Sequence, residues 1–300
     1  FAYMADITTP ENRAKGMGLI GAAFGLGFIA GPALGGLLAG SDPALADYRT
    51  PALAAAGLSF LALGMSFAIL KESLSREVRR RLAEKPRAQR WAQFRAALAR
   101  PRVSGLIGLT FLATFVFAGM EATFALWSNR QFGWGPAQNG YLFAFIGILS
   151  ATIQGGFIGR LAKKFGEARL IIFGTGSLAI GLGLIPFSGS LGYLIVAMIF
   201  IGIGFSVMSP SLNSLVSLQV GAEDQGGIMG VNRSANTLAR VLGPAWAGFL
   251  FATLGRNWPY FSGALLMGLV FLLAARGLKP FLTKGGPPGS KAGPLKAGQD

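Results

Sequence analysis

The sequence predicts an all-α integral membrane protein built from two related six-helix halves, from its composition, its long apolar runs and an internal repeat. Its 300 residues are 52% hydrophobic and 13% charged, with a mean hydropathy of +0.53, which lies outside the usual range of soluble domains. The net charge is +15, but the basic residues lie between apolar runs, which argues against a nucleic-acid-binding face. Without cysteine or histidine, the chain has no disulfides, thiolate chemistry or histidine metal sites. No metal or cofactor is expected.

Eight apolar runs come close to or exceed the roughly 20 residues that a helix needs to cross a bilayer. They lack the alternation of barrel strands, and an isolated strand cannot satisfy its backbone groups in lipid, so helices are predicted. The runs are 16–39, 52–70, 103–127, 137–159, 168–187, 190–218, 226–254 and 258–277.

Basic residues gather in alternate loops. The segment 71–102 holds 11 Lys and Arg residues, and 160–169 holds four. The loops on the opposite side hold only Arg49, Arg130 and Arg256. Since Lys and Arg concentrate in cytoplasmic loops, we expect the opening loop, the 71–102 segment and the C-terminal tail to face the cytoplasm.

The 71–102 segment contains a candidate amphipathic helix. Trp91, Phe94 and Leu98 share one helical face, and arginines take the other. This pattern fits a helix lying on the inner leaflet, and it fits a solvated linker helix equally well. The tail 279–300 is rich in Gly, Pro and Lys and is expected to be disordered.

An internal repeat relates the two ends of the chain. Without a gap, residues 10–38 align with residues 222–250 at ten identical positions out of 29. The copies lie six spans apart, so they cross the membrane in the same direction, as parallel repeats do. The offset also places the start of the first half roughly 110 residues before Phe1, so three and a half further helices are expected there. The predicted domains are 1–70 (end of helix 4 with helices 5 and 6), 71–102 (linker), 103–278 (helices 7 to 12) and 279–300 (tail).

The first copy contains the stretch GFIAGPALGG, in which Gly27, Gly31 and Gly35 recur every four residues. Small residues at this spacing let a neighbouring helix approach closely in lipid. Pro32 removes one backbone hydrogen bond and favours a bend. We interpret the stretch as a packing and hinge device, and a tight helix contact without any gating role is the alternative.

This stretch resembles the antiporter motif of drug/proton antiporters in the major facilitator superfamily, G-x-x-x-G-P-x-x-G-G, which stands here as Gly27, Gly31, Pro32, Gly35 and Gly36. The opening AYMADITTPENRAKGMGLIGAAFGLGF is similar to the tetracycline-resistance-like branch. The resemblance implies two pseudo-symmetric six-helix halves, drug efflux driven by proton entry, and a motif that seals the outward side.

A second element, GRLAKKFGEAR, resembles the family's cytoplasmic gating turn between the second and third helices of a half. Lys163 stands where the family usually has aspartate, which weakens a charge-relay role. The positions that match or flank the element are Gly159, Arg160, Leu161, Ala162, Lys164, Gly166 and Arg169.

One acidic residue, Glu121, lies inside a predicted span. A carboxylate in lipid costs several kcal/mol unless it is paired or neutralised, so Glu121 is predicted either to exchange a proton during transport or to be permanently paired. Where the first copy has Ile20, Gly21, Phe24 and Phe28, the second has Asn232, Arg233, Asn236 and Arg240, which fall on one helical face.

Glu121 and Arg240 both lie roughly 20 to 27 Å from the cytoplasmic ends of their helices. We therefore expect an ion pair or a shared water-filled cavity, with Arg233 as a further ion-pair candidate. Asn232 and Asn236 are predicted to line the substrate cavity. Gln154, Asn213 and Met208 are weaker candidates, since each is more often a packing residue.

The sequence thus favours a proton-driven exporter of small amphipathic drugs, acting as a monomer in a bacterial plasma membrane, with lipid, substrate and protons as its partners. A sugar or metabolite transporter of the same fold is the main alternative. A membrane-embedded enzyme is disfavoured because no second catalytic group accompanies Glu121. The polar face at 232–240 argues against a non-transporting sensor or scaffold.

Overall fold

The computed structural model describes residues 10–69, 99–219 and 222–278, and within these ranges the chain forms helices without strands. The predicted amphipathic helix around Trp91 and the tail lie outside the described residues. The helices are α2 (Pro10–Ala39), α3 (Arg49–Ile69), α6 (Pro101–Phe132), α7 (Pro136–Thr152), η1 (Ile153–Phe157), α8 (Ile158–Phe165), α9 (Glu167–Leu184), η2 (Ile185–Phe187), α10 (Leu191–Leu218), α11 (Ala222–Thr253) and α12 (Trp258–Gly277).

Six candidate membrane spans are found among the described residues: Arg49–Ile69, Val103–Phe132, Pro136–Phe165, Glu167–Phe187, Leu191–Leu218 and Trp258–Gly277. The other two expected spans correspond to α2 and α11. In α2 the described apolar segment is Gly25–Ala39, and the apolar run continues toward the N-terminus in the sequence. The 32-residue α11 is long enough, but its Asn and Arg side chains make it too polar to qualify by composition alone.

The expected single span at 137–159 is continuous but is not a regular α-helix throughout. It consists of α7, the π-helical η1 and α8, and reaches Phe165. The sequence of η1, IQGGF, holds two adjacent glycines, which weaken the regular helix locally. Such π-helical turns occur often at functional sites in helices.

Glycine ends several helices where the chain must turn. Gly133 follows α6 with φ 68°, and its N–H donates to Asn129 O. Gly166 separates α8 from α9 with φ 77°. These left-handed conformations suit glycine because it has no Cβ.

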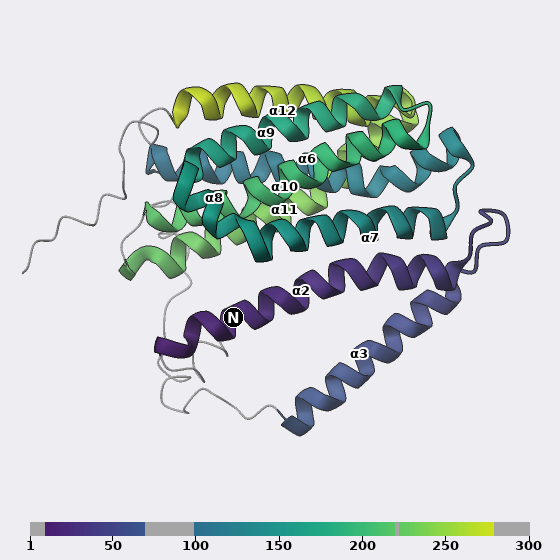
Figure 1. Cartoon of the computed structure of the whole chain (residues 1–300), viewed down its shortest axis with the longest axis horizontal. Coiled ribbons are helices and arrows are strands. Elements are labelled where there is room, and N and C mark those ends of the chain that lie inside the picture. The colour runs from purple at the N-terminus through teal and green to yellow at the C-terminus, as the bar shows by residue number, and fades with distance from the viewer. Residues whose placement is uncertain (1–9, 70–98, 220–221, 279–300) are drawn as a thin grey trace, which may run out of the picture.

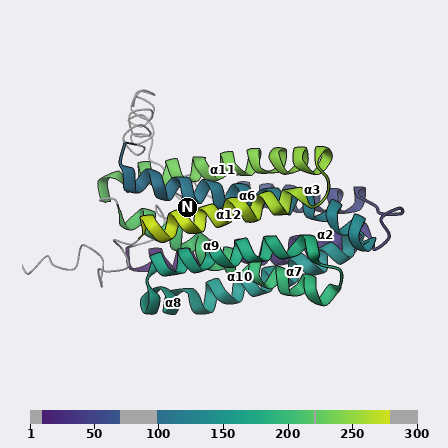
Figure 2. The ribbon, with the colours of Figure 1, turned by 90° about the horizontal axis from the view of Figure 1, so that it is seen from above.

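Helices α6 to α12 pack into one bundle, whose buried core includes Phe124, Trp127, Leu178, Met198 and Tyr260. Helix α2 runs beside α7, while α3 diverges from the bundle (Figure 1). No residue of α3 is buried. Viewed from above, α12 lies over α9, and α11 lies next to α6 (Figure 2).

Candidate functional site

The expected Gly-Pro helix, α2, meets α7 at a close seam near its C-terminal end. A Cβ placed on Gly36 would lie 2.7 Å from Pro136 O and 3.1 Å from Gly140 Cα. A Cβ on Gly140 would overlap Pro32 O. Beyond the helix ends, the Ala137 N–H donates to Gly40 O at 3.0 Å. We call this contact the α2–α7 seam, and it joins the two predicted halves.

The seam does not use the glycines that the four-residue spacing singled out. A Cβ on Gly27, Gly31 or Gly35 would meet nothing within 4 Å among the described residues. The close approach falls at Gly36 instead, because α7 crosses the face of α2 that carries Pro32 and Gly36. Spacing identifies a helix that can be approached closely, but not the face on which its neighbour lies.

Glu121 and Arg240 lie together between α6 and α11. Arg240 Nη1 is 3.8 Å from Glu121 Oε2, and the side chains of Arg240 and Glu121 are 54% and 37% exposed, respectively. The expected juxtaposition of these two residues is therefore present in the structure. The 3.8 Å separation makes the pair loose, and both side chains are partly exposed in the part of the chain that the structure describes.

The helices are held in this register by a second glycine contact. Gly243 of α11 packs against α6, where a Cβ on Gly243 would overlap Phe115 O. A Cβ on Gly119 would lie 3.0 Å from both Gly243 O and the Cβ of Ala247. We call this contact the α6–α11 seam. It brings the polar face of α11 close to α6.

Polar side chains continue from the ion pair along α11. Thr114 Oγ1 donates to Asn236 Oδ1 at 2.5 Å, and Asn236 Nδ2 donates to Asn232 O at 3.2 Å. Asn232 Nδ2 donates to Asn213 Oδ1 at 2.9 Å. These four residues, Thr114, Asn213, Asn232 and Asn236, form what we call the polar seam of α6, α10 and α11.

Not all predicted cavity residues are accessible. Asn232 is 1% exposed, and its Oδ1 has no hydrogen-bond partner in the described part of the chain. Met208 is also 1% exposed and is held against α9, where a Cβ on Gly174 would lie 2.7 Å from its Cβ. Met208 therefore packs against α9 in this structure, and its assignment to the cavity stays a prediction. Gln154 is exposed on η1, whereas Arg233 is exposed on α11.

The predicted cytoplasmic turn lies where α8 meets α9. Gly159, Arg160, Lys164 and Arg169 are exposed, and Gly166 makes the turn itself. Lys164 Nζ lies 5.3 Å from the centre of the Phe165 ring. The Ser214 hydroxyl of α10 donates to Glu167 Oε1 at 3.2 Å. This turn is thus tied to the same helix that contributes Asn213 to the polar seam.

Several relevant residues were not singled out by the sequence. Thr114 and Ser214 look ordinary in sequence, because hydroxyls in membrane helices commonly bond to their own backbone, and Glu167 looks like an ordinary acid of a polar turn. The π-helical turn at η1 left one trace, the Gly155–Gly156 pair. A polar residue on a neighbouring helix can be paired with α11 only once the helices are assembled.

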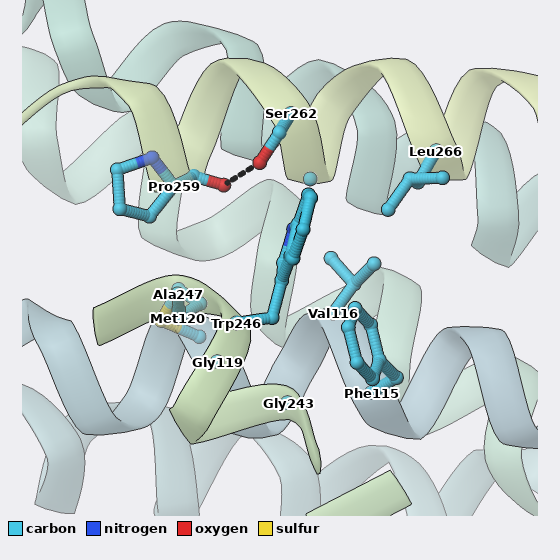
Figure 3. A pocket seen from close by; sticks show the side chains of 11 residues that line it. Phe115, Val116, Gly119, Met120, Gly243, Trp246, Ala247, Pro259, Ser262 and Leu266 are labelled. Carbon is cyan, nitrogen blue, oxygen red and sulfur yellow. Dashed lines mark hydrogen bonds between the residues drawn. The ribbon is translucent and has the colours of Figure 1, made fainter. Parts of the chain in front are cut away.

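A separate pocket lies among α6, α11 and α12 (Figure 3). It is partly open and largely apolar, with Trp246 and Leu266 facing it and Ser262 donating to Pro259 O at 3.0 Å. Trp246 is 44% exposed. Neither Glu121 nor Arg240 lines this pocket, so it is distinct from the ion pair.

The fold and these seams define a multi-helix membrane protein. The chain belongs to the Major Facilitator Superfamily, whose family model matches residues 1–244 and 152–297. The family assignment made from the Gly-Pro motif is therefore confirmed. Members of this family are transporters.

Two curated relatives are resistance proteins. Multidrug resistance protein 2 of Bacillus subtilis (strain 168) is 32% identical over 268 residues, covering 89% of this chain and 65% of the relative. Tetracycline resistance protein, class C, of Escherichia coli is 30% identical over 257 residues, covering 86% of this chain and 63% of the relative. The chain thus spans about two thirds of the length of these relatives. The sequence identities confirm its relationship to drug-efflux members of the superfamily.

A solved structure supports the same fold. The human organic anion transporter MFSD10 (TETRAN) matches with a TM-score of 0.63 and 30% sequence identity, covering 91% of this chain and 66% of that chain. The chain is accordingly a multi-pass membrane protein. Its relatives include proteins named for drug resistance and one named for organic anion transport.

Proposed function

We propose that the protein of which these residues are part exports small amphipathic drugs in exchange for protons by alternating access of its two halves. The observation that carries the proposal is the loose Glu121–Arg240 pair, since an acid with a single cationic partner can take up a proton and release that partner. The names of the tetracycline and multidrug resistance relatives support the substrate class.

In this proposal the α2–α7 seam is the outer gate. Its contacts lie at the end of α2 and the start of α7, between the predicted halves (Figure 1). Rocking of one half against the other would open and close this seam. We place the protein in a bacterial plasma membrane as a monomer, with the 71–102 linker and the tail in the cytoplasm. The energy source is the proton gradient, without a cofactor.

The test uses cells that express the full reading frame, loaded with tetracycline or cationic dyes, with and without an uncoupler. We expect the wild type to lower accumulation in an uncoupler-sensitive manner, and Glu121→Gln to lose at least tenfold of this activity, because the amide cannot carry the proton. Asp42→Asn, which neutralises an acid in the exposed loop after α2, is the matched control. Full activity in Glu121→Gln would refute the assigned role.

Removing both partners tests whether the pair acts as a unit. If it does, Glu121→Gln combined with Arg240→Ala should transport no worse than the poorer single variant, since coupled residues are not additive. Additive losses would indicate two independent roles.

Transport of an organic anion is the second candidate function, and a different observation favours it. Arg240 is 54% exposed beside Glu121, so its guanidinium can also bind a carboxylate of a solute, and one solved relative is named as an organic anion transporter. Including carboxylate dyes in the same panel discriminates the two. Activity on anions alone would favour this candidate, whereas activity on sugars or metabolites alone would favour the alternative left open by the sequence.

A further inference from the structure

We propose that the polar seam binds water and conducts the transported proton between Glu121 and the cytoplasmic end of the bundle. The inference rests on the proposed function, because it assigns a route to the proton that Glu121 exchanges. It assigns Asn232, Asn213 and Asn236, which the sequence proposes for the substrate cavity, to proton movement in place of substrate binding, together with Thr114.

The Asn232 side chain is the first reason to place water in the seam. It is 1% exposed, yet its Oδ1 accepts no hydrogen bond from any residue that the structure describes. Leaving a buried acceptor without a partner costs about 1–3 kcal/mol. Rotating the amide would turn Asn232 Oδ1 toward Asn213 Oδ1, so that two acceptors faced each other in place of the 2.9 Å bond. A bound water is the small donor that satisfies such an oxygen.

The polar seam has the right place and direction for a route. Thr114 lies seven residues before Glu121 on α6, about 10 Å along the helix, and Asn236 lies one turn before Arg240 on α11. From there the hydrogen bonds lead to Asn232 and then to Asn213 of α10.

The route then reaches the cytoplasmic side. Asn213 is followed by Ser214, whose hydroxyl donates to Glu167 Oε1 at the start of α9. Glu167 lies in the turn that the sequence assigns to the cytoplasm. The polar seam therefore lies between an acid inside the membrane, Glu121, and an acid at the turn assigned to the inner surface, Glu167.

Amide side chains do not themselves relay protons, so water must fill the intervals. Glu121–H gives its proton to a first water, the proton passes along waters held by Thr114, Asn236 and Asn232, and it leaves to Glu167 or bulk water. Glu121 is then a carboxylate beside Arg240, and no other bond is made or broken. Proton entry to Glu121 from the outside completes one inward transfer per cycle.

Along the described parts of α6, α7, α10 and α12, Glu121 is the only acid. Helices α7, α10, α11 and α12 pack against α6. Neither α7 nor α10 carries a charged side chain, and their titratable groups are Tyr141 and Tyr193. The other titratable groups on α11 are Arg233 and Arg240, with Glu223 and Asp224 in its first turn. Helix α12 carries Tyr260 and Arg276, and α6 itself carries Arg102 and Arg130.

The experiment separates proton movement from substrate movement in proteoliposomes that contain the complete protein, with tetracycline as the first substrate and a pH-sensitive dye inside. Substrate counterflow exchanges labelled for unlabelled substrate without net proton transfer. We expect Asn232→Leu to lower proton-coupled transport at least tenfold while counterflow stays within about twofold of wild type. A loss of both activities in parallel would overturn the proposal, because it would indicate a structural role.

Two further variants complete the design. Asn232→Ser keeps an oxygen and leaves room for water, so transport in this variant should stay coupled to protons. If Asn232→Leu fails to fold, Asn232→Ser still tests the inference, because a loss of proton coupling in Asn232→Ser would contradict a water-filled route. Ser234→Ala on the same helix is the control and should behave as wild type, because the Ser234 hydroxyl donates to Gly230 O of its own helix.

The outcomes also distinguish this inference from the proposed function. If vesicles with the wild-type protein transport tetracycline without proton movement, the proposed function fails. If the wild type couples transport to protons and Asn232→Leu couples equally well, the proposed function stands and the route through the polar seam is wrong.

Discussion

Helices α2 and α11 are copies of one sequence repeat, but they use it in different ways. Both carry the Gly-Pro pair, at Gly31–Pro32 and at Gly243–Pro244. In α2 the tight contact falls on Gly36, which meets α7 across the two predicted halves. In α11 it falls on Gly243, which meets α6 within one half. The aligned partner of Gly36 is Gly248, and that of Gly243 is Gly31. A Cβ placed on Gly248 or Gly31 would meet nothing within 4 Å among the described residues.

One glycine-rich motif therefore offers two packing faces. Each copy uses a different face, and the choice depends on which helix lies beside it. The polar residues are divided in the same way. Only α11 carries Asn232, Asn236 and Arg240, and it packs against the helix that carries Glu121. The copy inside one half thus holds the charged site, while the copy between the halves forms the proposed gate.

The largest expected effect is at the α6–α11 seam. Gly243→Ala would drive its Cβ into Phe115 O, and overpacking against backbone costs roughly 1–3 kcal/mol of unfolding free energy. Gly31→Ala, the aligned change in α2, should be neutral or slightly stabilising because its Cβ enters open space. Thermal unfolding of the protein in detergent checks both, and equal effects would erase the distinction between the faces.

A smaller stability effect with a functional signature is expected at the α2–α7 seam. Gly36→Ala places a Cβ 2.7 Å from Pro136 O, so α2 must shift and the proposed outer gate should close poorly. We expect a loss of about 1 kcal/mol with a several-fold drop in transport. Labelling of a cysteine introduced near the outer end should rise in this variant. Gly248→Ala is the aligned control, and a comparable drop there would contradict a special role for the seam between the halves.

The smallest expected effect is on stability in acid, and it concerns the loops that follow α2 and α11. After α2, Asp47 accepts hydrogen bonds from the Thr50 hydroxyl and from the Arg49 and Thr50 N–H groups. These bonds, led by the Thr50 hydroxyl, hold the pKa of the Asp47 carboxyl below its usual value. A lowered folded-state pKa gives stability that is present above the unfolded value and is lost as pH falls through the folded value.

Asp47→Asn should therefore lower the melting temperature slightly near neutral pH and reduce its fall below about pH 4. Melting curves from pH 6 to pH 3 measure this difference. After α11 the corresponding loop uses a neutral contact, in which Trp127 Nε1 donates to Asn257 Oδ1 at 2.9 Å, so Asn257→Ala removes no titratable group and should leave the acid limb of the melting curve unchanged. An unchanged acid limb in Asp47→Asn would contradict the role of its carboxylate.

Much of the architecture could be predicted from apolar runs because lipid requires every backbone polar group to bond within its own helix. The start of α12 at Trp258 and the end of α10 at Leu218 match the predicted runs. The repeat and its Gly-Pro pair were sufficient to identify the superfamily. The π-helical turn at η1 was not predicted, because the difference in free energy between an α-helical and a π-helical turn is small and depends on the side chains packed around it.

The candidate site was predictable only in part. Glu121 and Arg240 stand out because charges are rare in apolar runs, and their equal depth can be counted along the helices. The packing of Met208 against α9 could not be predicted, because hydrophobicity and helix position do not reveal which neighbour covers a side chain. Its partner, Gly174, lies on α9 and has no sequence feature that indicates the contact.

The sequence by itself determined the membrane class, the helix positions, the repeat and the presence of a charged pair inside the bilayer. These properties follow from local chemistry, namely apolar length, residue size and the cost of charge in lipid. Only the tertiary structure decided which glycine of each copy meets a neighbour and which polar atom, Asn232 Oδ1, is left unsatisfied. Those outcomes depend on how the helices cross, and crossing is set by the packing of many side chains at once.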